Sequence, residues 1–336
     1  MAEYLLLDVA IAYVIDLIAG DPYWLPHPVR FIGWLIKHTE VCLRKRIEKT
    51  VKGAVERRKA ERRAGMALML IVVASTFLIV LAIQELAAML HPAAFHIVNI
   101  YFIYSALAAE CLADEARKVY KVLKTGDMDE SRKRLSMLVG RETKNLNRQE
   151  ITRGVVETTA ENTVDGVISP LIYAIAGSLF GVGAPVVYAF KAISTLDSMV
   201  GYMNDKYINL GMFSARTDDA ANYLPARFSG ILIPASALIC GMSFSKSFSI
   251  MIRDRRNHKS PNCAYPEAAV AGALGIRIGG TNIYFGKAVE KPTIGDAERD
   301  ISIEDIPRTI LLMYVSSALT LIIGLISAMV IKKIIF

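Results

Sequence analysis

The stretch Met66–Gln84 constrains the fold of this sequence more than any other feature, because it is an apolar run without a charged residue. It supplies about the 20 residues that an α-helix needs to cross a hydrocarbon layer of about 30 Å. Hydrophobic residues make up 53% of the 336-residue chain, whereas soluble domains usually contain about 45–50%. We therefore predict an integral membrane protein.

Six apolar segments are candidates for membrane helices, judged by their length and by the charges that bracket them. They are residues 4–19, 66–90, 94–113, 166–190, 226–244 and 308–331. Gly181, Gly183 and Pro185 interrupt the fourth segment, and Pro234 lies in the fifth. Interrupted apolar stretches often return to the side they entered or pack against protein. We therefore predict broken or re-entrant helices there.

Acidic residues lie inside the first and third of these candidate segments. Asp8 and Asp16 are in the first segment, and Glu110 is near the end of the third. A charge at membrane depth is costly, so such residues are functional candidates. The two aspartates fit a helix at the membrane interface equally well.

The segment 37–63 is strongly basic, with eleven Lys or Arg and four Glu. Such a segment beside a membrane span is typical of a cytoplasmic loop in contact with anionic lipid. It lacks interleaved aromatic residues and any recognisable module, so we expect no nucleic-acid partner. For residues 191–225 and 245–307 to share the cytoplasmic side, the fourth and fifth segments must be re-entrant or buried.

Residues 114–163 form a polar region with helical spacing, and strand-like alternation appears nowhere in the chain. We therefore predict an all-α, multi-pass protein of the cell membrane. Residues 1–336 are expected to form a single membrane-embedded catalytic domain. Its active-site loops, 191–225 and 245–307, would face the cytoplasm.

The motif GDPYWLPHPVRFIG, residues 20–33, is the first block that suggests chemistry. Three prolines and two glycines fix an irregular backbone, which leaves Asp21, His27 and Arg30 on a rigid loop. An interfacial turn anchored by Trp24 explains the motif equally well.

The second block, RGVVETTAENTVDGVISP at 153–170, repeats an acidic residue every four positions. Glu157, Glu161 and Asp165 would form a ridge on a helix, with Asn162 adjacent. Like charges at this spacing repel, and a hard cation would remove the penalty. Mg²⁺ commonly uses one or two carboxylates and then substrate phosphates. A solvated acidic face is the alternative.

The third block spans residues 191–230 and mixes both signs of charge with glycines and aromatic residues. Cations there can hold phosphate or carboxylate, and Asp218 shares a face with Asn222 if the segment is helical. The mixture predicts a polar cleft, with a plain interfacial loop as the alternative. Its candidate residues are Lys191, Asp197, Tyr202, Asp205, Arg216, Asp218, Asp219, Asn222 and Arg227.

The fourth block, SPNCAYPEAAVAGALGIRIGGTNIYFGK at 260–287, ends in a glycine-rich stretch. It is not a Walker A loop, because five residues separate Gly280 from Gly286 and Ala288 follows Lys287 where Ser or Thr is needed. The backbone amides of Gly279 and Gly280 are still able to cradle an anion.

Together, the four blocks resemble the cobalamin-biosynthesis membrane family of adenosylcobinamide-phosphate synthases. The order and the separation of the blocks fit this family, and the resemblance covers most of the chain. The resemblance implies an ATP- and Mg²⁺-dependent amide ligase. Such an enzyme condenses a propionate of the corrinoid adenosylcobyric acid with (R)-1-aminopropan-2-ol or its O-phosphate. Our hypothesis is that ATP converts the propionate to an acyl phosphate, which the amine then attacks.

Under this hypothesis the candidate residues divide by role. Glu161, Asn162 and Asp165 would hold Mg²⁺ together with Glu157, and Lys191, Arg216 and Arg227 would bind phosphates. Asp197, Asp205, Asp218 and Asp219 would supply further metal or base functions, and Asn222 would assist nucleotide binding. Tyr202 would line a corrinoid cleft, unless it belongs to an interfacial aromatic belt. His27 would accept the amine's proton or lie beneath the corrin cobalt, unless it is an ordinary loop histidine.

Two other classes of protein compete with the ligase. A transporter usually shows an internal repeat and polar groups at the membrane midplane, whereas most acidic residues here fall between apolar blocks. A non-catalytic membrane sensor or scaffold would gain nothing from mutually repelling carboxylates. We expect contacts with membrane lipid, and either a homo-oligomer or contacts with other membrane enzymes of the cobalamin pathway.

Overall fold

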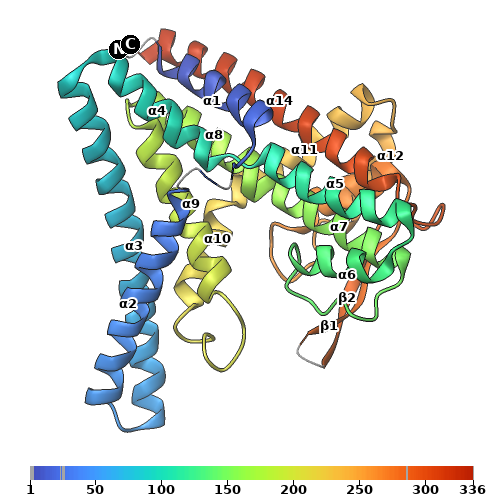
Figure 1. Ribbon diagram of the computed structural model, residues 1–336, viewed down its shortest axis with the longest axis horizontal. Coiled ribbons are helices and arrows are strands. Elements are labelled where there is room, and N and C mark those ends of the chain that lie inside the picture. The colour runs from blue at the N-terminus through green and yellow to red at the C-terminus, as the bar shows by residue number, and fades with distance from the viewer. Residues whose placement is uncertain (1–3, 23, 25–26, 285–286, 336) are drawn as a thin grey trace. The chain divides into compact units, whose positions relative to one another are not determined.

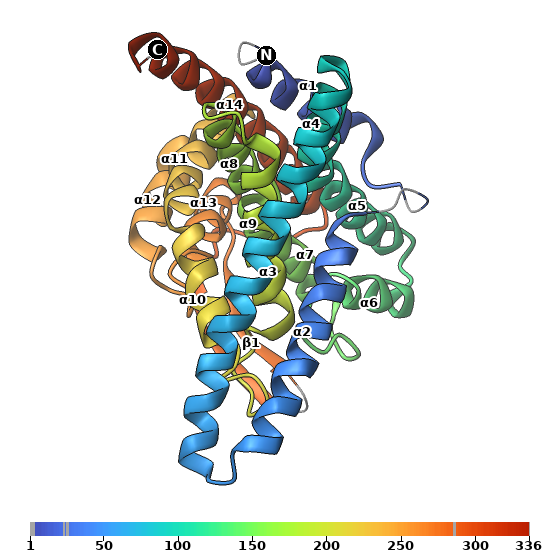
Figure 2. The ribbon, with the colours of Figure 1, turned by 90° about the vertical axis from the view of Figure 1, so that its left-hand side faces the viewer.

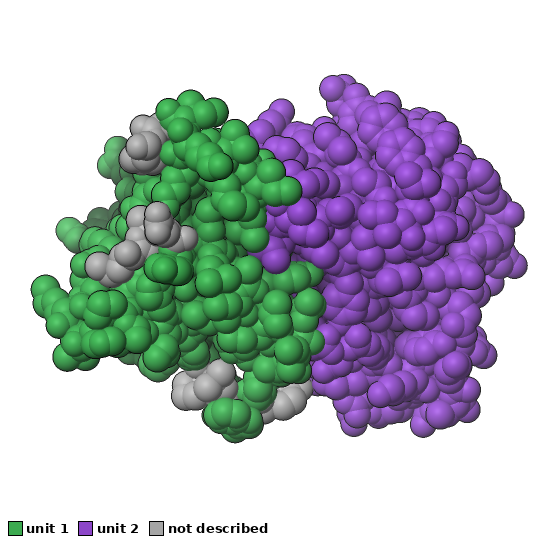
Figure 3. Space-filling view, turned by 90° about the horizontal axis from the view of Figure 1, so that it is seen from above, with its two compact units in different colours: residues 1–107, 170–221, 324–336 green, residues 108–169, 222–323 purple. Residues whose placement is uncertain are grey.

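The computed structural model describes residues 4–22, 24, 27–284 and 287–335. The chain divides into two compact units whose segments alternate along the sequence (Figure 3). Unit 1 comprises residues 1–107, 170–221 and 324–336, and unit 2 comprises residues 108–169 and 222–323. The expectation of a single catalytic domain stays a prediction.

Within the described residues of unit 1, the regular elements are all helices (Figure 1). Its helices are α1 (Leu5–Ala19), α2 (Val29–Thr50), α3 (Ala54–Leu90), α4 (Pro92–Ala106), α8 (Ser169–Ser178), α9 (Gly183–Val200), α10 (Met212–Ala221) and the end of α14 (Asp305–Ile335). Helices α2 and α3 run side by side and are joined by a short turn (Figure 2). The basic segment 37–63 is therefore mostly a helical hairpin and not an irregular loop.

Unit 2 contains helices and one two-stranded sheet. Its elements are α5 (Ala109–Thr125), α6 (Met128–Ser136), α7 (Arg148–Thr163), η1 (Val164–Ile168), α11 (Tyr223–Ile239), α12 (Phe244–Asp254), α13 (Ala264–Leu274), β1 (Ile278–Tyr284), β2 (Lys287–Ile294) and the first part of α14. One apolar core lies around α13, and a second joins α5, α6 and α7 to α14. The predicted helical character of the polar region 114–163 is confirmed.

Three helical stretches in the described part of the chain are long and apolar enough to cross a membrane. They are Ala54–Leu90, Pro92–Thr125 and Asp305–Ile334. These contain three of the six predicted segments, which supports the membrane character of the chain. Tyr223–Ile239 is a shorter apolar helix, and the predicted segment 166–190 is divided by the turn between α8 and α9. Re-entry of these shorter helices stays a prediction.

Two acidic residues inside the apolar helices, Asp8 and Glu110, accept hydrogen bonds. In unit 1, the buried Asp8 carboxylate accepts from His96 Nδ1 at 2.8 Å and from Asn99 Nδ2 at 2.7 Å. In unit 2, Glu110 accepts from Arg117 at 2.6 Å and from the Tyr314 hydroxyl. These contacts offset the cost of placing a carboxylate away from water.

The antiparallel hairpin of β1 and β2 is the element that the all-α prediction missed. Its register shifts between Ile278 and Gly280, so that two residues of β2, Pro292 and Thr293, lie opposite Gly279 and form a bulge. Gly279 has φ +85°, and a Cβ atom there would lie 2.4 Å from the Pro292 carbonyl oxygen. Only glycine fits this position. The bulge and Pro292 break the alternating pattern by which a strand is recognised in a sequence.

The π-helical segment η1 lies between α7 and α8, and it explains how the chain accommodates Pro170. A proline in a regular helix lacks an N–H donor, and its ring clashes with the carbonyl group four residues earlier. Here the Ser169 N–H donates to the Val164 carbonyl five residues earlier, which widens the turn just before the proline. Asp165 lies in this wide turn. Such segments are rare and are often found at functional sites.

Candidate functional site

Glu157 lies at the centre of a buried polar cluster in unit 2. One carboxylate oxygen accepts from the Gly279 N–H at 2.8 Å, and the other is 2.8 Å from Arg141 Nη1. Arg153 Nε is 3.7 Å from the first oxygen. This carboxylate is thus fully engaged in fixing the hairpin to α7. Gly279 does bind an anionic group, as the sequence suggested, and that group is Glu157.

Asn282 on β1 completes this cluster. Its side-chain oxygen accepts from Arg141 Nη1 at 2.5 Å and lies 3.4 Å from Arg153 Nη2. The sequence analysis singled out none of these three residues as site candidates. They lie on three separate segments, and no local motif joins them.

Glu161, one helical turn beyond Glu157, has a different environment. It is partly exposed, and it accepts a hydrogen bond from the Cys263 thiol at 3.1 Å. Burial, followed by the charge of Glu161, holds the pKa of Cys263 well above its usual range, so the thiol stays protonated. Because the Glu161 carboxylate has only the weak thiol donor and is accessible to solvent, it is able to bind a further ligand.

Asn162 and Asp165 lie beside Glu161 on the same helical stretch, and both are partly exposed. The Asn162 amide nitrogen donates to the Thr158 carbonyl at 2.8 Å, so its side-chain oxygen points away from that bond. Within the described residues, no group of three or more His, Cys, Asp or Glu side chains is arranged to hold a metal ion. Mg²⁺ needs only one or two carboxylates when phosphates supply the rest, so the predicted oxygen ligands fit it.

Glu267 on α13 is a buried acidic residue that the sequence analysis did not select. Burial, followed by the nearby charges of Glu161 and Glu157, holds the pKa of Glu267 well above its usual range. Its environment therefore favours the protonated, neutral form of the side chain. The signal for it was present, because Glu267 is the only charged residue in Ala264–Leu274.

Arg227 on α11 is held between two aromatic rings. Its guanidinium carbon lies 3.3 Å from the centre of the Tyr223 ring and 4.6 Å from that of Tyr265. It also donates to Asn262 Oδ1 at 2.8 Å. Stacking and hydrogen bonding orient the cation, as an anion-binding role requires.

Asn222 is buried and has a structural contact. Its side-chain oxygen accepts from the Ser169 hydroxyl at 2.6 Å, which ties the residue before α11 to the end of η1. A contact with nucleotide stays a prediction for this residue.

In unit 1, the loop before α2 places His27 close to Asp21 and Lys191. His27 Nδ1 accepts from the Val29 N–H at 3.3 Å, and Nε2 lies 3.7 Å from the Asp21 carboxylate. Burial lowers the pKa of His27; Asp21 partly opposes this shift, while Lys191 and Arg30 add to it. The imidazole is therefore neutral at pH 7, with its hydrogen on Nε2 beside Asp21, and it would accept a proton on Nδ1 in place of the long hydrogen bond from Val29.

Four further unit 1 candidates lie on α9 and α10, which pack against each other. Asp218 lies near Tyr173, whose pKa is raised by burial and then by the Asp218 charge. Asp197 and Asp219 are partly exposed, and Arg216 is exposed.

Tyr202 and Asp205 lie on the loop between α9 and α10, and both are exposed. The loop is held by the basic hairpin, where Arg44 donates to the Lys206 carbonyl at 2.8 Å and Arg62 donates to Asn209 at 3.2 Å. This packing gives part of the basic segment a structural role.

The predicted site residues therefore fall into two groups. Unit 2 contains Glu157, Glu161, Asn162, Asp165, Asn222 and Arg227, and unit 1 contains His27, Lys191, Asp197, Tyr202, Asp205, Arg216, Asp218 and Asp219. That the two groups form one site stays a prediction.

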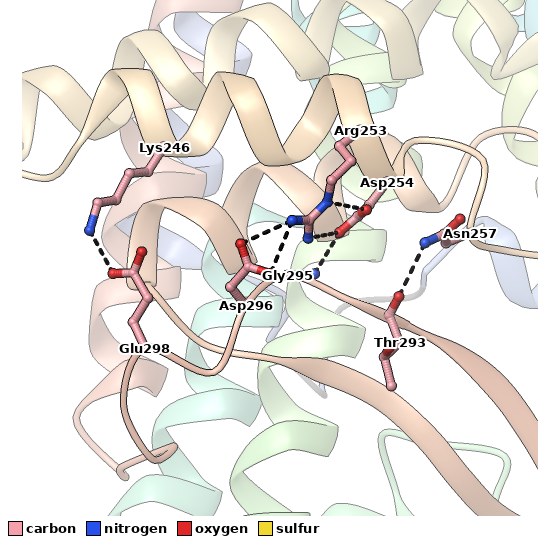
Figure 4. Close-up of polar contacts among 8 residues, drawn as sticks. All are labelled: Lys246, Arg253, Asp254, Asn257, Thr293, Gly295, Asp296 and Glu298. Carbon is pink, nitrogen blue, oxygen red and sulfur yellow. Dashed lines mark hydrogen bonds and ion pairs between the residues drawn. The ribbon is translucent and has the colours of Figure 1, made fainter.

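The C-terminal end of β2 is fixed to α12 by a second polar cluster (Figure 4). Asp254 accepts two hydrogen bonds from Arg253 and one from the Gly295 N–H, each at 2.8 Å. Arg253 also donates to both oxygens of Asp296 at 3.0 Å. The open end of the hairpin is thus fixed twice, with the start of β1 held by Glu157 and the end of β2 held by this cluster.

Comparisons with known proteins cover nearly the whole chain. A family model described as CobD/Cbib protein matches residues 9–313. The Cobalamin biosynthesis protein CobD of Clostridium tetani is 48% identical over 321 residues, which are 95% of this chain and 96% of that protein. The Cobalamin biosynthesis protein CbiB of Salmonella typhimurium is 48% identical over 311 residues, 93% of each chain. No solved structure matches the chain. A match of this extent shows that the chain belongs to the CobD/Cbib family.

Proposed function

We propose that this chain acts in cobalamin biosynthesis as an ATP- and Mg²⁺-dependent amide ligase. It joins (R)-1-aminopropan-2-ol, or its O-phosphate, to adenosylcobyric acid and yields adenosylcobinamide or its phosphate. The observation that carries the proposal is the family match over residues 9–313, a range that includes every candidate site residue. The relatives' names, which specify cobalamin biosynthesis, support it.

The chemistry requires an activated carboxylate, since an amide does not form spontaneously from a carboxylate and an amine in water. A propionate oxygen attacks the terminal phosphorus of ATP, which forms an acyl phosphate and releases ADP. The amine nitrogen then attacks the acyl carbon, and inorganic phosphate leaves as the amide forms. A base takes the proton that the amine loses.

The unit 2 carboxylates are suited to the metal. Glu161 and Asp165, with the Asn162 side-chain oxygen, offer the hard oxygen ligands that Mg²⁺ prefers. When bound, the metal would neutralise charge that develops on the phosphoryl group. Glu157 is already paired with Arg141, so its contribution is to position the hairpin near these ligands.

The unit 1 residues are suited to proton transfer and to binding anions. His27 is the first candidate for the base, because its pKa is lowered and Asp21 lies beside Nε2. Asp197, Asp205, Asp218 and Asp219 are further base or metal candidates. Lys191 and Arg216, with Arg227 of unit 2, would bind phosphates, and Asn222 and Tyr202 would contact nucleotide or corrinoid.

The test is a reconstituted reaction. Purified protein receives ATP, Mg²⁺, adenosylcobyric acid and each amine in turn, and ADP and the corrinoid amide are measured. We expect both products in equal amounts, and only when all components are present. Corrinoid flux across liposomes without ATP, and without amide, would instead favour a transporter. Retention of the corrinoid with neither reaction nor flux would favour a sensor.

A further inference from the structure

The cluster around Glu157 contains more hydrogen-bond donors than the described residues satisfy. Arg141 and Asn282 are buried, with Arg141's side chain 5% exposed and Asn282 2% exposed. Four of the cluster's buried nitrogen atoms make no hydrogen bond within the described part of the chain: Arg141 Nε and Nη2, Arg153 Nε, and Asn282 Nδ2. A buried donor without a partner costs about 1–3 kcal/mol, and more when it is charged.

The charges in the cluster are also unequal. The guanidinium groups of Arg141 and Arg153 share one carboxylate, that of Glu157. Buried charges are normally paired, so an excess cation in such a place calls for an additional anion. The Asn282 side chain is oriented to add a donor for such an anion, because its oxygen faces the arginines and its amide nitrogen makes no hydrogen bond.

We propose that Arg141, Arg153 and Asn282 bind a phosphate group of a substrate. Guanidinium groups present forked donors that match phosphate oxygens, and three donor side chains suit a group with several acceptors. Gly280 leaves room at the edge of the cluster, where even a Cβ atom would lie 3.4 Å from Arg153 Nη1. This site is additional to Lys191, Arg216 and Arg227.

Two substrates of the proposed reaction carry such a group: the nucleotide, and the amine if it is an O-phosphate. The shared chemistry is a phosphate monoester or a polyphosphate end. The identity of these ligands rests on the proposed function, whereas the presence of an anion site rests on the cluster alone.

The decisive variant is Asn282→Asp, tested in the full chain in lipid nanodiscs. An aspartate there supplies the missing anion from within the protein, so it should satisfy the arginines and repel phosphate. Thr281→Asp is the matched control, because it adds the same charge to the adjacent, exposed position on the opposite face of β1. Arg153→Met is a second variant, since the longer Arg153–Glu157 ion pair contributes less to the fold than the Arg141 pair.

Binding is measured by calorimetry with three probes: the β,γ-imido analogue of ATP, aminopropanol O-phosphate and inorganic phosphate. We expect Asn282→Asp and Arg153→Met to weaken at least one organic probe tenfold or more. Asn282→Asp should also raise the unfolding temperature, and Thr281→Asp should match the wild type. The probe that is weakened identifies the source of the phosphate.

Two outcomes overturn the inference: unchanged affinity of Asn282→Asp for all three probes, or a wild type that binds none of them. The amide assay separates this result from the proposed function. Amide formation by the wild type, with probe binding unaffected by Asn282→Asp, refutes the phosphate site and leaves the ligase intact. If Asn282→Asp loses probe binding and the wild type forms no amide, the phosphate site stands and the ligase proposal is refuted.

Discussion

Glu157 and Glu161 lie on one face of the same helix, yet their carboxylates have different partners. The four-residue spacing predicted their common face, and both do lie near α13 and the hairpin. Spacing does not reveal the partner of each side chain. Arg141 and Gly279, distant in sequence, neutralise Glu157, whereas Glu161 receives only a thiol donor. The ridge was therefore predictable, but the division of roles within it was not.

We predict opposite effects of the two glutamine substitutions. Glu161→Gln should lower the rate of amide formation by at least a hundredfold and leave the unfolding temperature close to the wild-type value. Glu157→Gln should destabilise the protein by about 3–5 kcal/mol, because it leaves Arg141 without its counter-ion. Amide formation and thermal unfolding of both variants test this pair. Wild-type activity in Glu161→Gln contradicts the assigned metal role.

Glu267 leads to a prediction about pH. The pKa of Glu267 is higher in the folded state than its ordinary value of 4.5, so the protonated side chain favours folding. This contribution to stability is complete below pH 4.5 and is lost as the pH rises toward the folded-state pKa. Each pH unit in that interval costs about 1.4 kcal/mol. Glu267→Gln should therefore match the wild type at pH 4 and be more stable at pH 7. Glu298→Gln, at an exposed position, is the control, and equal pH profiles for all three proteins would contradict the prediction.

At the scale of elements, the helices were predictable and the hairpin was not. Helical spacing and caps are local signals, such as the Asn147 and Glu150 capping box that begins α7. The hairpin depends on contacts with α7 and α12 that are remote in sequence. Its bulge also disrupts the alternation that would have shown it. Sequence analysis recognised the glycines of 279–280 but took them for a loop.

We predict that Gly279→Ala destabilises unit 2 by about 2 kcal/mol or more. The new Cβ atom meets the Pro292 oxygen, and the positive φ is unfavourable for alanine. Gly140→Ala is the control, because a Cβ atom there has no neighbour within 4 Å and that position has no positive φ. Thermal unfolding of both variants measures the difference. Equal stability would show that the bulge is not required.

At the scale of the whole molecule, apolar length identified three stretches that are long and apolar enough to span a membrane. The shorter apolar helices have the composition of membrane segments, but composition does not determine whether a short helix crosses. Their hydrogen-bonded polar residues, such as Asp8, show that some of these helices are packed in protein. The number of crossings depends on tertiary packing and so was not predictable from the sequence.

We predict that the two ends of α3 lie on opposite sides of the membrane, with the basic end in the cytoplasm. In a chain whose cysteines at 111, 240 and 263 are replaced by alanine, the exposed Cys42 should react with an impermeant maleimide only in inverted vesicles. The same chain with Cys42→Ala and Ala93→Cys should react only in right-side-out cells. Labelling of both positions from one side would contradict the orientation.

The wide turn of η1 gives this region a particular sensitivity to mutation. A wide turn rotates less per residue than an α-helix, so it keeps Asp165 closer to the line of Glu161 than regular geometry would. Changes at 164–168 that favour regular α-helical geometry would turn this carboxylate aside. Substitutions chosen only for thermal stability are therefore poor candidates for an active enzyme at these five positions.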